Sequence, residues 1–338
     1  MNNIEMLKFF NLKDNPFKLE VILETFVGYD LEREKLINAI NNREKIILVS
    51  GPTGAGKTTL LLWIYKNINI KNKIYIYKPF NEKEEFEEYI KSRFTLFERF
   101  IYKIKQFDLI NYLNKKNLVI FLDEATFFSH EMLEWIKVLS DQTKCTFILS
   151  GLPEFEEKLI KEHRTLYERI LTKIYLKSLD PKSGKLLVKK RLELAGNPNL
   201  FTDEAIEEIY HLAGGLPREI LKYSYEALLI AYRERKNIVD KQIVDKIYEA
   251  KRPPTDILKL TEKQRYIIEL LTKYGPKTVN ELLKLFRERY PDTTIHAISN
   301  ILKRMVESKY LIRTKVKGKF VYDAVPAIKD YFIREINK

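Results

Sequence analysis

The sequence predicts an α/β domain with a parallel sheet, followed by a helical domain and a C-terminal winged helix-turn-helix. Over the first 180 residues, short apolar segments alternate with helical ones, as in a parallel sheet covered on both faces. Only helical patterns follow to about residue 252, and the last part of the chain has the order helix, helix, helix, hairpin. We therefore expect three domains, at 1–180, 181–252 and 259–338.

A glycine-rich loop that fits the pattern G-x-x-x-x-G-K-[ST] is expected to organise the α/β domain. The apolar, strand-like segment Lys45–Ser50 precedes the loop and a helical segment follows it, so backbone N–H groups and the helix dipole can hold a polyphosphate. Lys57 would reach the β and γ phosphates, and Thr58 would ligate Mg2+. An ordinary glycine-rich turn is the alternative. The predicted nucleotide-binding residues are Gly51, Pro52, Thr53, Gly54, Ala55, Gly56, Lys57, Thr58 and Thr59.

Composition excludes several classes of protein. The chain has 338 residues, 45% of them hydrophobic, which is enough to fill a core in two or three domains. Its apolar runs fall far short of the roughly 20 residues that cross a bilayer, and Met1–Glu5 does not fit a cleavable signal. The lone Cys145 excludes internal disulfides and a cysteine-rich metal site. We expect a cytoplasmic protein with no membrane partner.

The positive charge is concentrated near the C-terminus. The formal net charge is +13, and Lys259 to Lys338, with 18 basic and 9 acidic residues, supplies +9 of it. Such a field attracts a polyanion, usually nucleic acid. A solvated, lysine-rich surface explains the charge equally well.

Before the second strand, the sequence predicts an irregular lead-in over Met1–Tyr29 and a helix from an N-cap at Asp30 to Ile40. A second strand is expected at Ile74–Tyr77, and a helix from Glu82 to Asp108. The predicted buried stripe of that long helix is Phe86, Tyr89, Ile90, Phe94, Phe97 and Ile101.

Two carboxylates follow the next predicted strand, Leu118–Leu122. Beside a phosphate loop, Asp123 would hold the Mg2+ shell and Glu124 would polarise the attacking water. A solvated pair of carboxylates at a strand end is the alternative. The strand Cys145–Leu149 likewise ends in a polar side chain, Ser150, which could touch the γ phosphate.

The remaining elements of the first two domains follow in order. Helices are predicted at His130–Ser140 and Glu154–Ile170, and the last strand at Lys173–Leu176. Four helices then make the second domain, two of them capped by Thr202 and Asp240: 182–194, 202–212, 217–235 and 240–250. Lys251–Thr255 is predicted to be a stiff linker.

The C-terminal pattern predicts a winged helix whose third helix enters the major groove and whose hairpin contacts phosphates or the minor groove. The three helices run from Thr261 to Tyr274, Thr278 to Tyr290 and Pro291 to Ser308, with Ile295, Ile298, Leu302 and Met305 facing inward. The predicted DNA-binding residues are Thr294, His296, Asn300, Lys303, Arg304, Arg313, Lys315, Lys317 and Lys319. A winged helix that contacts protein is the alternative.

Taken in order, these motifs resemble the AAA+ ATPases over about 250 residues. Lys57 and Thr58 match the Walker A pair, and Asp123 and Glu124 match the Walker B pair. The remaining matches are Ser150 at the first sensor, Arg218 of Gly215-Leu216-Pro217-Arg218 at the second sensor, Arg169 at the arginine finger with Arg164 in reserve, and Val27-Gly28-Tyr29 at the adenine pocket. The resemblance implies ATP and Mg2+ as cofactors.

Two branches of the family fit. Phe10–Phe17, Asp123-Glu124-Ala125 and Ser150–Glu154 look most like transposition-regulator and secretion-associated ATPases. The C-terminal winged helix is similar to that of archaeal replication initiators of the origin-recognition type. The initiators usually carry another pair before the sensor arginine, whereas the transposition ATPases often lack this winged helix.

The resulting expectation is a nucleotide switch on double-stranded DNA that acts in replication initiation or in transposition and recombination. A homo-oligomer completed by Arg169, and a helicase or transposase partner, fit the same resemblance. The alternative is a signalling or scaffold ATPase whose winged helix binds a protein. A metabolic kinase would have no use for the Walker B pair, the lid arginine and the winged helix.

Overall fold

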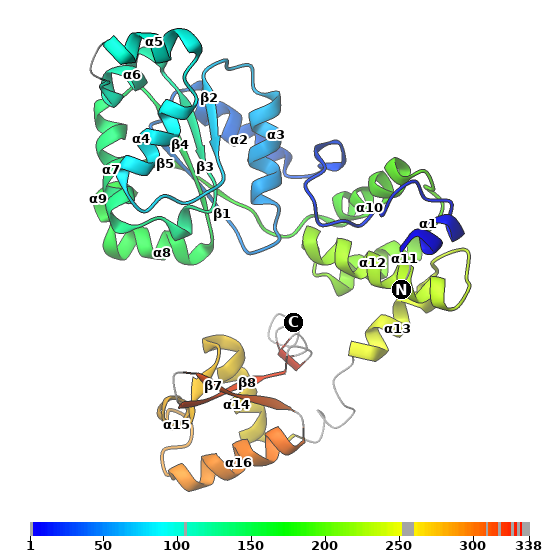
Figure 1. The fold of residues 1–338 in the computed structure, drawn as a ribbon. Helices are drawn as coiled ribbons and strands as arrows, with labels where there is room; N and C mark the ends of the chain where they lie inside the picture. The colour runs from blue at the N-terminus through cyan, green and yellow to red at the C-terminus, as the bar shows by residue number, and fades with distance from the viewer. Residues whose placement is uncertain are drawn as a thin grey trace. The chain divides into compact units, whose positions relative to one another are not determined.

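The computed structural model describes residues 3–104, 107–251, 260–308, 310–316, 319–325, 328–329 and 332. It divides into two compact units, Met1–Asp245 and Lys246–Lys338 (Figure 1). The first unit contains the sheet and most of the expected helical domain of residues 181–252, which we call the lid, and the second contains the winged helix. The expected linker falls largely on residues 252–259, which lie outside the described residues.

The first unit is built on a five-stranded parallel sheet, which confirms the predicted α/β class. Its strands are β1 (Ile46–Ser50), β2 (Lys73–Ile76), β3 (Val119–Leu122), β4 (Thr146–Gly151) and β5 (Ile170–Tyr175), in the order β2-β3-β4-β1-β5. All four neighbouring pairs are parallel, so the carboxyl ends of β1, β3 and β4 meet at one edge. The candidate site lies along that edge.

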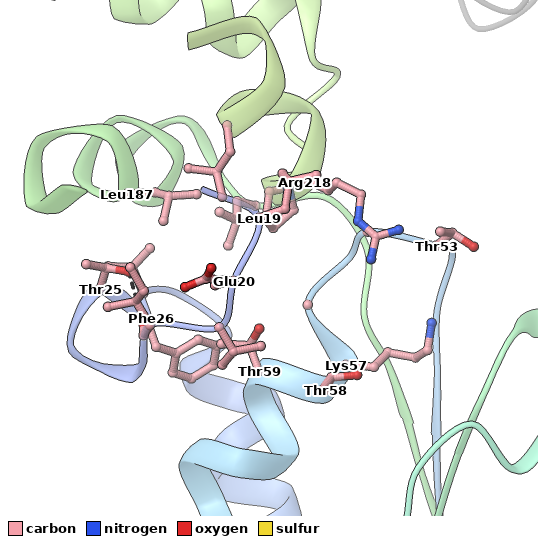
Figure 2. A pocket seen from close by; sticks show the side chains of 18 of the residues that line it. Leu19, Glu20, Thr25, Phe26, Thr53, Lys57, Thr58, Thr59, Leu187 and Arg218 are labelled. Carbon is pink, nitrogen blue, oxygen red and sulfur yellow. Dashed lines mark hydrogen bonds between the residues drawn. The ribbon is translucent and has the colours of Figure 1, made fainter. Parts of the chain in front are cut away.

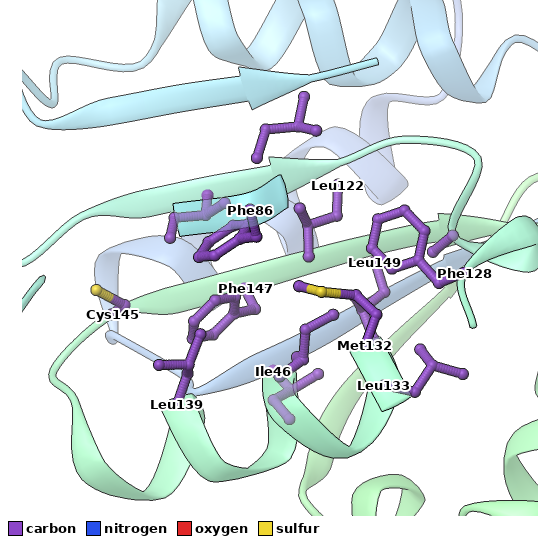
Figure 3. Packing of buried hydrophobic residues seen from close by; sticks show 14 of the residues in the cluster. Ile46, Phe86, Leu122, Phe128, Met132, Leu133, Leu139, Cys145, Phe147 and Leu149 are labelled. Atoms are coloured by element: carbon purple, nitrogen blue, oxygen red, sulfur yellow. The ribbon is translucent and has the colours of Figure 1, made fainter. Parts of the chain in front are cut away.

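Helices cover both faces of this sheet because its apolar strands alternate their side chains between two cores. On one face, Val49 and Phe121 pack with α2 (Asp30–Asn41) and α3 (Lys57–Asn67). On the other face, Phe147 and Leu149 belong to a second core, part of which is shown in Figure 3. The helices that cover this face can be followed in Figure 1. Those helices are α4 (Lys83–Ser92), α6 (Leu109–Lys116), α7 (His130–Gln142) and α8 (Pro153–Glu162).

Two long helices of the prediction are in fact interrupted. The segment from Glu82 ends its first helix at Ser92 and restarts as α5 (Leu96–Ile104), where Thr95 and Glu98 exchange hydrogen bonds that favour a new helix start. In the expected stripe, Phe86, Ile90 and Phe94 are buried and Tyr89 packs against them, whereas the side chains of Phe97 and Ile101 lie outside the described residues.

The second interrupted helix breaks at His163. A short α9 (Arg164–Tyr167) follows α8, and Ile170 already belongs to β5. The expected N-cap was also wrong by one residue. Tyr29, with a φ of 57°, is the N-cap of α2, while Asp30 is its first residue and pairs with Arg33. Asp is a preferred N-cap residue, but the sequence alone does not show that the backbone of the preceding residue, Tyr29, is left-handed.

The lead-in, expected to be irregular, contains the helix α1 (Asn3–Phe9) and the short 3-10 helix η1 (Leu23–Thr25). Its first part packs on the helical elements rather than on the sheet, and α1 lies beside α12 (Figure 1). The helical elements are α10 (Pro181–Ala195), α11 (Asp203–Leu212), α12 (Pro217–Arg233) and α13 (Lys241–Lys251). Side chains of Thr202 and Asp240 accept the expected capping hydrogen bonds from Ala205 and Ile243.

The second unit has the expected winged-helix order. It consists of α14 (Glu262–Tyr274), β6 (Lys277–Thr278), α15 (Val279–Phe286), α16 (Ile295–Glu307), β7 (Leu311–Val316) and β8 (Lys319–Ala324). The strands form an antiparallel sheet in the order β6-β8-β7, and α15 ends four residues before the expected Tyr290. Ile298, Leu302 and Met305 are buried as expected, but Ile295 is 42% exposed, because it is the first residue of α16 and lies beyond the core.

Candidate nucleotide-binding site

The phosphate loop joins β1 to α3, and its glycines have structural reasons to be there. Gly54 and Gly56 adopt φ values of 84° and 95°, in the left-handed region that favours glycine. A Cβ on Gly54 would also lie 2.8 Å from the Cβ of Arg218. The loop is therefore shaped for close approach, both to α12 and to a ligand.

Lys57 has its ammonium group directed back onto the loop. Its Nζ donates hydrogen bonds to the carbonyls of Gly51 at 2.7 Å and Pro52 at 3.2 Å. Burial lowers the pKa of Lys57 from its ordinary value, whereas the nearby carboxylates of Glu124 and Asp123 raise it. The ammonium thus holds a position that an incoming phosphate could take over from the two carbonyls.

The two carboxylates differ in their surroundings. Asp123 is buried, and its Oδ1 accepts a hydrogen bond of 3.0 Å from the Glu124 backbone N–H. Its Oδ2 accepts a hydrogen bond of 2.9 Å from the hydroxyl of Tyr75, which the sequence analysis did not identify. Burial, followed by the charge of Asp123, raises the pKa of Tyr75, so the hydroxyl remains a donor. Only the pairing of β2 with β3 brings this tyrosine to the site.

Glu124 has a φ of 54° and its side chain lines the cavity, as expected of a residue that faces a ligand. The hydroxyl of Thr58, at the start of α3, and the carboxylate of Asp123, directly after β3, are hard oxygen donors of the kind that Mg2+ prefers. Among the residues that the structure describes, no cluster of three or more His, Cys, Asp or Glu could hold a metal ion without further ligands.

A cavity of about 440 Å³ lies between the phosphate loop and α12 (Figure 2). At one end are Thr53, Lys57 and Arg218, whose guanidinium points toward Thr53 (Figure 2). The backbone N–H of Arg218 also donates to the carbonyl of Gly54 at 3.3 Å. The structure thus brings the loop, Glu124 and the lid arginine to one cavity.

The other end of the cavity is mostly apolar. Thr25, Phe26, Leu19 and Leu187 lie there in Figure 2, and Val21, Ile22 and Leu221 also line the cavity. None of these residues was predicted, because they come from the lead-in and from two helices far along the chain. The only available signal was the apolar character of the lead-in.

Tyr29 lines the cavity, but its hydroxyl lies 2.7 Å from the carbonyl of Ala55 and 2.8 Å from that of Lys177. It therefore ties the phosphate loop to the segment after β5. Gly28 is not among the lining residues, and its φ of 71° lets the chain pass close to Leu179.

Ser150 and the two arginine-finger candidates lie outside the cavity lining. Ser150 is buried in β4 and its Oγ has no hydrogen-bond partner among the described residues. Arg169 forms two hydrogen bonds of 2.8 Å to the carboxylate of Asp141, which raises the pKa of Arg169 further. Arg164 is largely exposed and pairs with Glu168 at 2.9 Å. None of these three side chains lines the cavity in this single chain.

The predicted DNA-binding residues lie on the surface of the winged helix as far as they are described. His296, Asn300, Lys303 and Arg304 are exposed on α16, and Arg313 and Lys315 are exposed on β7. The Thr294 side chain already caps α16 by accepting from the Ala297 N–H at 3.2 Å. Lys317 and the side chain of Lys319 lie outside the described residues.

The first unit has the parallel α/β fold and the phosphate loop that are typical of the P-loop AAA+ fold. A protein-family model described as an AAA domain matches residues 40–159, which include the phosphate loop and both carboxylates. These residues are similar to that domain, and the fold of the chain resembles that of an archaeal ORC2 protein. Within the described residues, no helix is long and apolar enough to cross a membrane.

Three proteins that are similar to this chain have different descriptions. General secretion pathway protein A of Aeromonas hydrophila is 27% identical over 243 residues, covering 67% of this chain; the chain spans only 44% of that protein. An uncharacterized HTH-type transcriptional regulator of Methanocaldococcus jannaschii is 23% identical over 332 residues, covering 93% of this chain and 76% of the relative. The Aeropyrum pernix ORC2 protein, solved as ADPNP-ADP complexes, superposes with a TM-score of 0.58 at 15% identity, covering 96% and 97% of the two chains.

Proposed function

We propose that this protein is an ATP-dependent switch that binds double-stranded DNA and hydrolyses ATP with Mg2+. The observation that carries the proposal is the convergence of Lys57, Glu124 and Arg218 on one cavity. Phosphate-binding, water-orienting and lid residues meet there, in a chain that also carries a winged helix with exposed basic residues.

In the nucleotide-bound protein, Lys57 would exchange the carbonyls of Gly51 and Pro52 for phosphate oxygens. Thr58 and Asp123 would hold Mg2+, which neutralises phosphate charge and helps to fix its geometry. Glu124 would orient the attacking water, and Arg218 would bind the γ phosphate and draw α12 toward the loop. ATP and ADP would then favour different lid positions.

The DNA-binding part of the proposal depends on the charge of the winged helix. Lys303 and Arg304 are exposed on α16, and Arg313 and Lys315 are exposed on β7. Basic side chains on the third helix and on the hairpin suit major-groove entry and phosphate contact. The description of the Methanocaldococcus relative as an HTH-type transcriptional regulator supports the same assignment.

We place the switch in replication initiation or in transposition and recombination, with a helicase or transposase as partner. The fold shared with an archaeal origin-recognition protein supports the first setting. Arg169 would act across a subunit interface in a homo-oligomer, after leaving Asp141.

A second candidate function is a signalling or scaffold ATPase whose winged helix binds a protein. The exposed apolar side chains of Ile295, Ile312 and Phe320 favour it. One experiment separates the two functions: fluorescence anisotropy with a random duplex at two salt concentrations, with ATP, with ADP and with neither. We expect salt-sensitive binding that changes with nucleotide. Absence of binding in every state would overturn the DNA assignment and favour the protein-binding winged helix.

A further inference from the structure

The lead-in is anchored to the lid over residues 10–20. Phe10 and Phe17 are buried, and Phe17 packs edge-on against Phe201 with ring centroids 5.4 Å apart. The Lys13 N–H donates to the carbonyl of Ala195 at 2.9 Å, at the end of α10. The segment before the cavity is therefore structurally a part of the lid.

Arg191 of α10 makes the last of these connections before the lead-in enters the cavity. Its Nη1 donates to the carbonyl of Lys18 and its Nη2 to the carbonyl of Glu20, both at 3.1 Å. The side chain is only 5% exposed, and its Nε has no hydrogen-bond partner in the part of the chain that the structure describes. Burial lowers the pKa of Arg191, although an arginine stays charged at neutral pH.

Burying a cation is costly, and among the described residues Arg191 has no salt bridge, although the charge of Glu20 opposes the lowering of its pKa by burial. Such a residue needs a structural or functional reason. Both acceptors are main-chain carbonyls, which means that Arg191 fixes the path of the backbone over residues 18–20. Arg191 itself lines the cavity, as do the residues that this path carries into it: Leu19, Glu20, Val21 and Ile22.

The cavity thus has a cationic end and an end that is mostly apolar. Lys57, Thr58 and Arg218 lie at the first end, and Leu19, Phe26 and Leu187 lie at the second (Figure 2). A planar, largely apolar group such as a nucleobase suits the second end. The hydrogen bonds from Arg191 hold residues 18–20, which belong to this wall, against α10.

We propose that Arg191 is a positioning residue for the nucleobase: it clamps residues 18–20 to α10 and so preforms the apolar end of the cavity. This inference rests on the nucleotide binding proposed above. Preorganisation of the wall raises affinity for any ligand that carries the base and does nothing for a ligand without one. Arg218 faces the phosphate end, so its side chain should affect the affinity for a ligand through the phosphates and not through the base.

The test is calorimetric binding of ATP, ADP and inorganic tripolyphosphate to the full chain and to Arg191→Met. We expect the affinities for ATP and ADP to fall by a similar factor, about tenfold or more, which is the loss of about 1.4 kcal/mol of binding free energy. Tripolyphosphate, which has no base, should change by less than about twofold. Arg191→Lys, which can restore one donor, should recover part of the loss.

Two matched variants complete the design. Lys190→Met removes a neighbouring cation from the same helix and should leave all three affinities unchanged, whereas Arg218→Ala should weaken ATP and tripolyphosphate more than ADP. If Arg191→Met leaves ATP and ADP affinity unchanged, or weakens tripolyphosphate equally, the clamp is wrong. If the unsubstituted protein binds no nucleotide, the proposed function itself fails. Should Arg191→Met not fold, the same comparison is made with Arg191→Lys.

Discussion

The hydroxyl of Tyr75 donates a hydrogen bond of 2.9 Å to Oδ2 of Asp123, within the buried region between β2 and β3. The ring of Tyr75 stacks on Phe121 with centroids 5.9 Å apart, so its position is fixed by packing as well as by the hydrogen bond. Because the Glu124 N–H satisfies Oδ1, each oxygen of the carboxylate has one donor. The carboxylate is therefore held in one orientation beside the phosphate loop.

Replacing Tyr75 with Phe would remove one donor from this buried carboxylate. We expect the free energy of unfolding to fall by about 1–3 kcal/mol, the usual cost of leaving a buried polar group unsatisfied. Urea denaturation measures the change. Tyr65→Phe is the matched control, since Tyr65 packs edge-on against the same ring and its hydroxyl makes no hydrogen bond among the described residues. Equal losses in the two variants would contradict the role given to the Tyr75 hydroxyl.

Replacing Glu124 with Gln should preserve ATP binding and slow hydrolysis by about 100-fold or more. The amide keeps the size of the side chain but no longer accepts a proton from the attacking water. Phosphate release and ATP affinity, measured on the same preparation, give the two quantities. Unchanged hydrolysis would remove the assignment.

Replacing Arg169 with Ala should lower hydrolysis by about 1,000-fold while ATP still binds, because an arginine finger acts on transition-state charge. Mixing this variant with Glu124→Gln supplies the decisive measurement. Some interfaces then combine an intact Glu124 with an intact Arg169 from the neighbouring subunit, and activity should return. No recovery would mean that Arg169 does not act across subunits. The same loss in Arg164→Ala instead would assign the finger to Arg164.

The ion pair between Arg169 and Asp141 should make the free energy of unfolding depend on pH. The hydrogen bonds from Arg169 hold the pKa of Asp141 below its usual range. The stabilisation is therefore present above the unfolded pKa of about 3.9 and is lost as the pH falls through the lower folded pKa. Asp141 is half exposed, so Asp141→Asn should cost at most about 1 kcal/mol at pH 7. Stability curves of the two proteins should converge below about pH 3, and a gap that widens on acidification would contradict this.

Replacing Lys315 and Lys317 with Ala should weaken binding to all duplex sequences. Each lost phosphate contact should also reduce the slope of log affinity against log salt by about 0.9. Lys284→Ala, on the exposed side of α15, is the control and should change neither quantity. Substitutions at His296 or Asn300 should instead alter sequence preference, because those side chains lie on the third helix. An unaltered salt slope would exclude contact by the hairpin.

The phosphate loop and the carboxylate pair could be predicted because both are local patterns. Gly54 and Gly56 need positive φ angles within a single loop, and Asp123 and Glu124 follow their own strand directly. The capping boxes that begin α14 and α15 are likewise set by residues three apart, Thr261 with Gln264 and Thr278 with Glu281.

Errors arose where the deciding interaction was distant or involved backbone conformation. The left-handed backbone of Tyr29 makes this residue, and not Asp30, the N-cap of α2. Thr95 and Glu98 form hydrogen bonds where one helix ends and the next begins, although the apolar pattern continues through this point. Ile295 keeps the helical spacing of its inward neighbours but is exposed at the helix start.

The sequence by itself determined the parallel α/β class, the phosphate loop, the carboxylate pair and the winged-helix order, because side-chain period, turn residues and caps act over a few positions. The tertiary structure alone decided that Tyr75 reaches Asp123 and that Arg191 holds the lead-in against α10. The first contact depends on strand order, and the second joins residues more than 170 positions apart. Pairings at such separations are selected by the packing of whole elements, which no local pattern encodes.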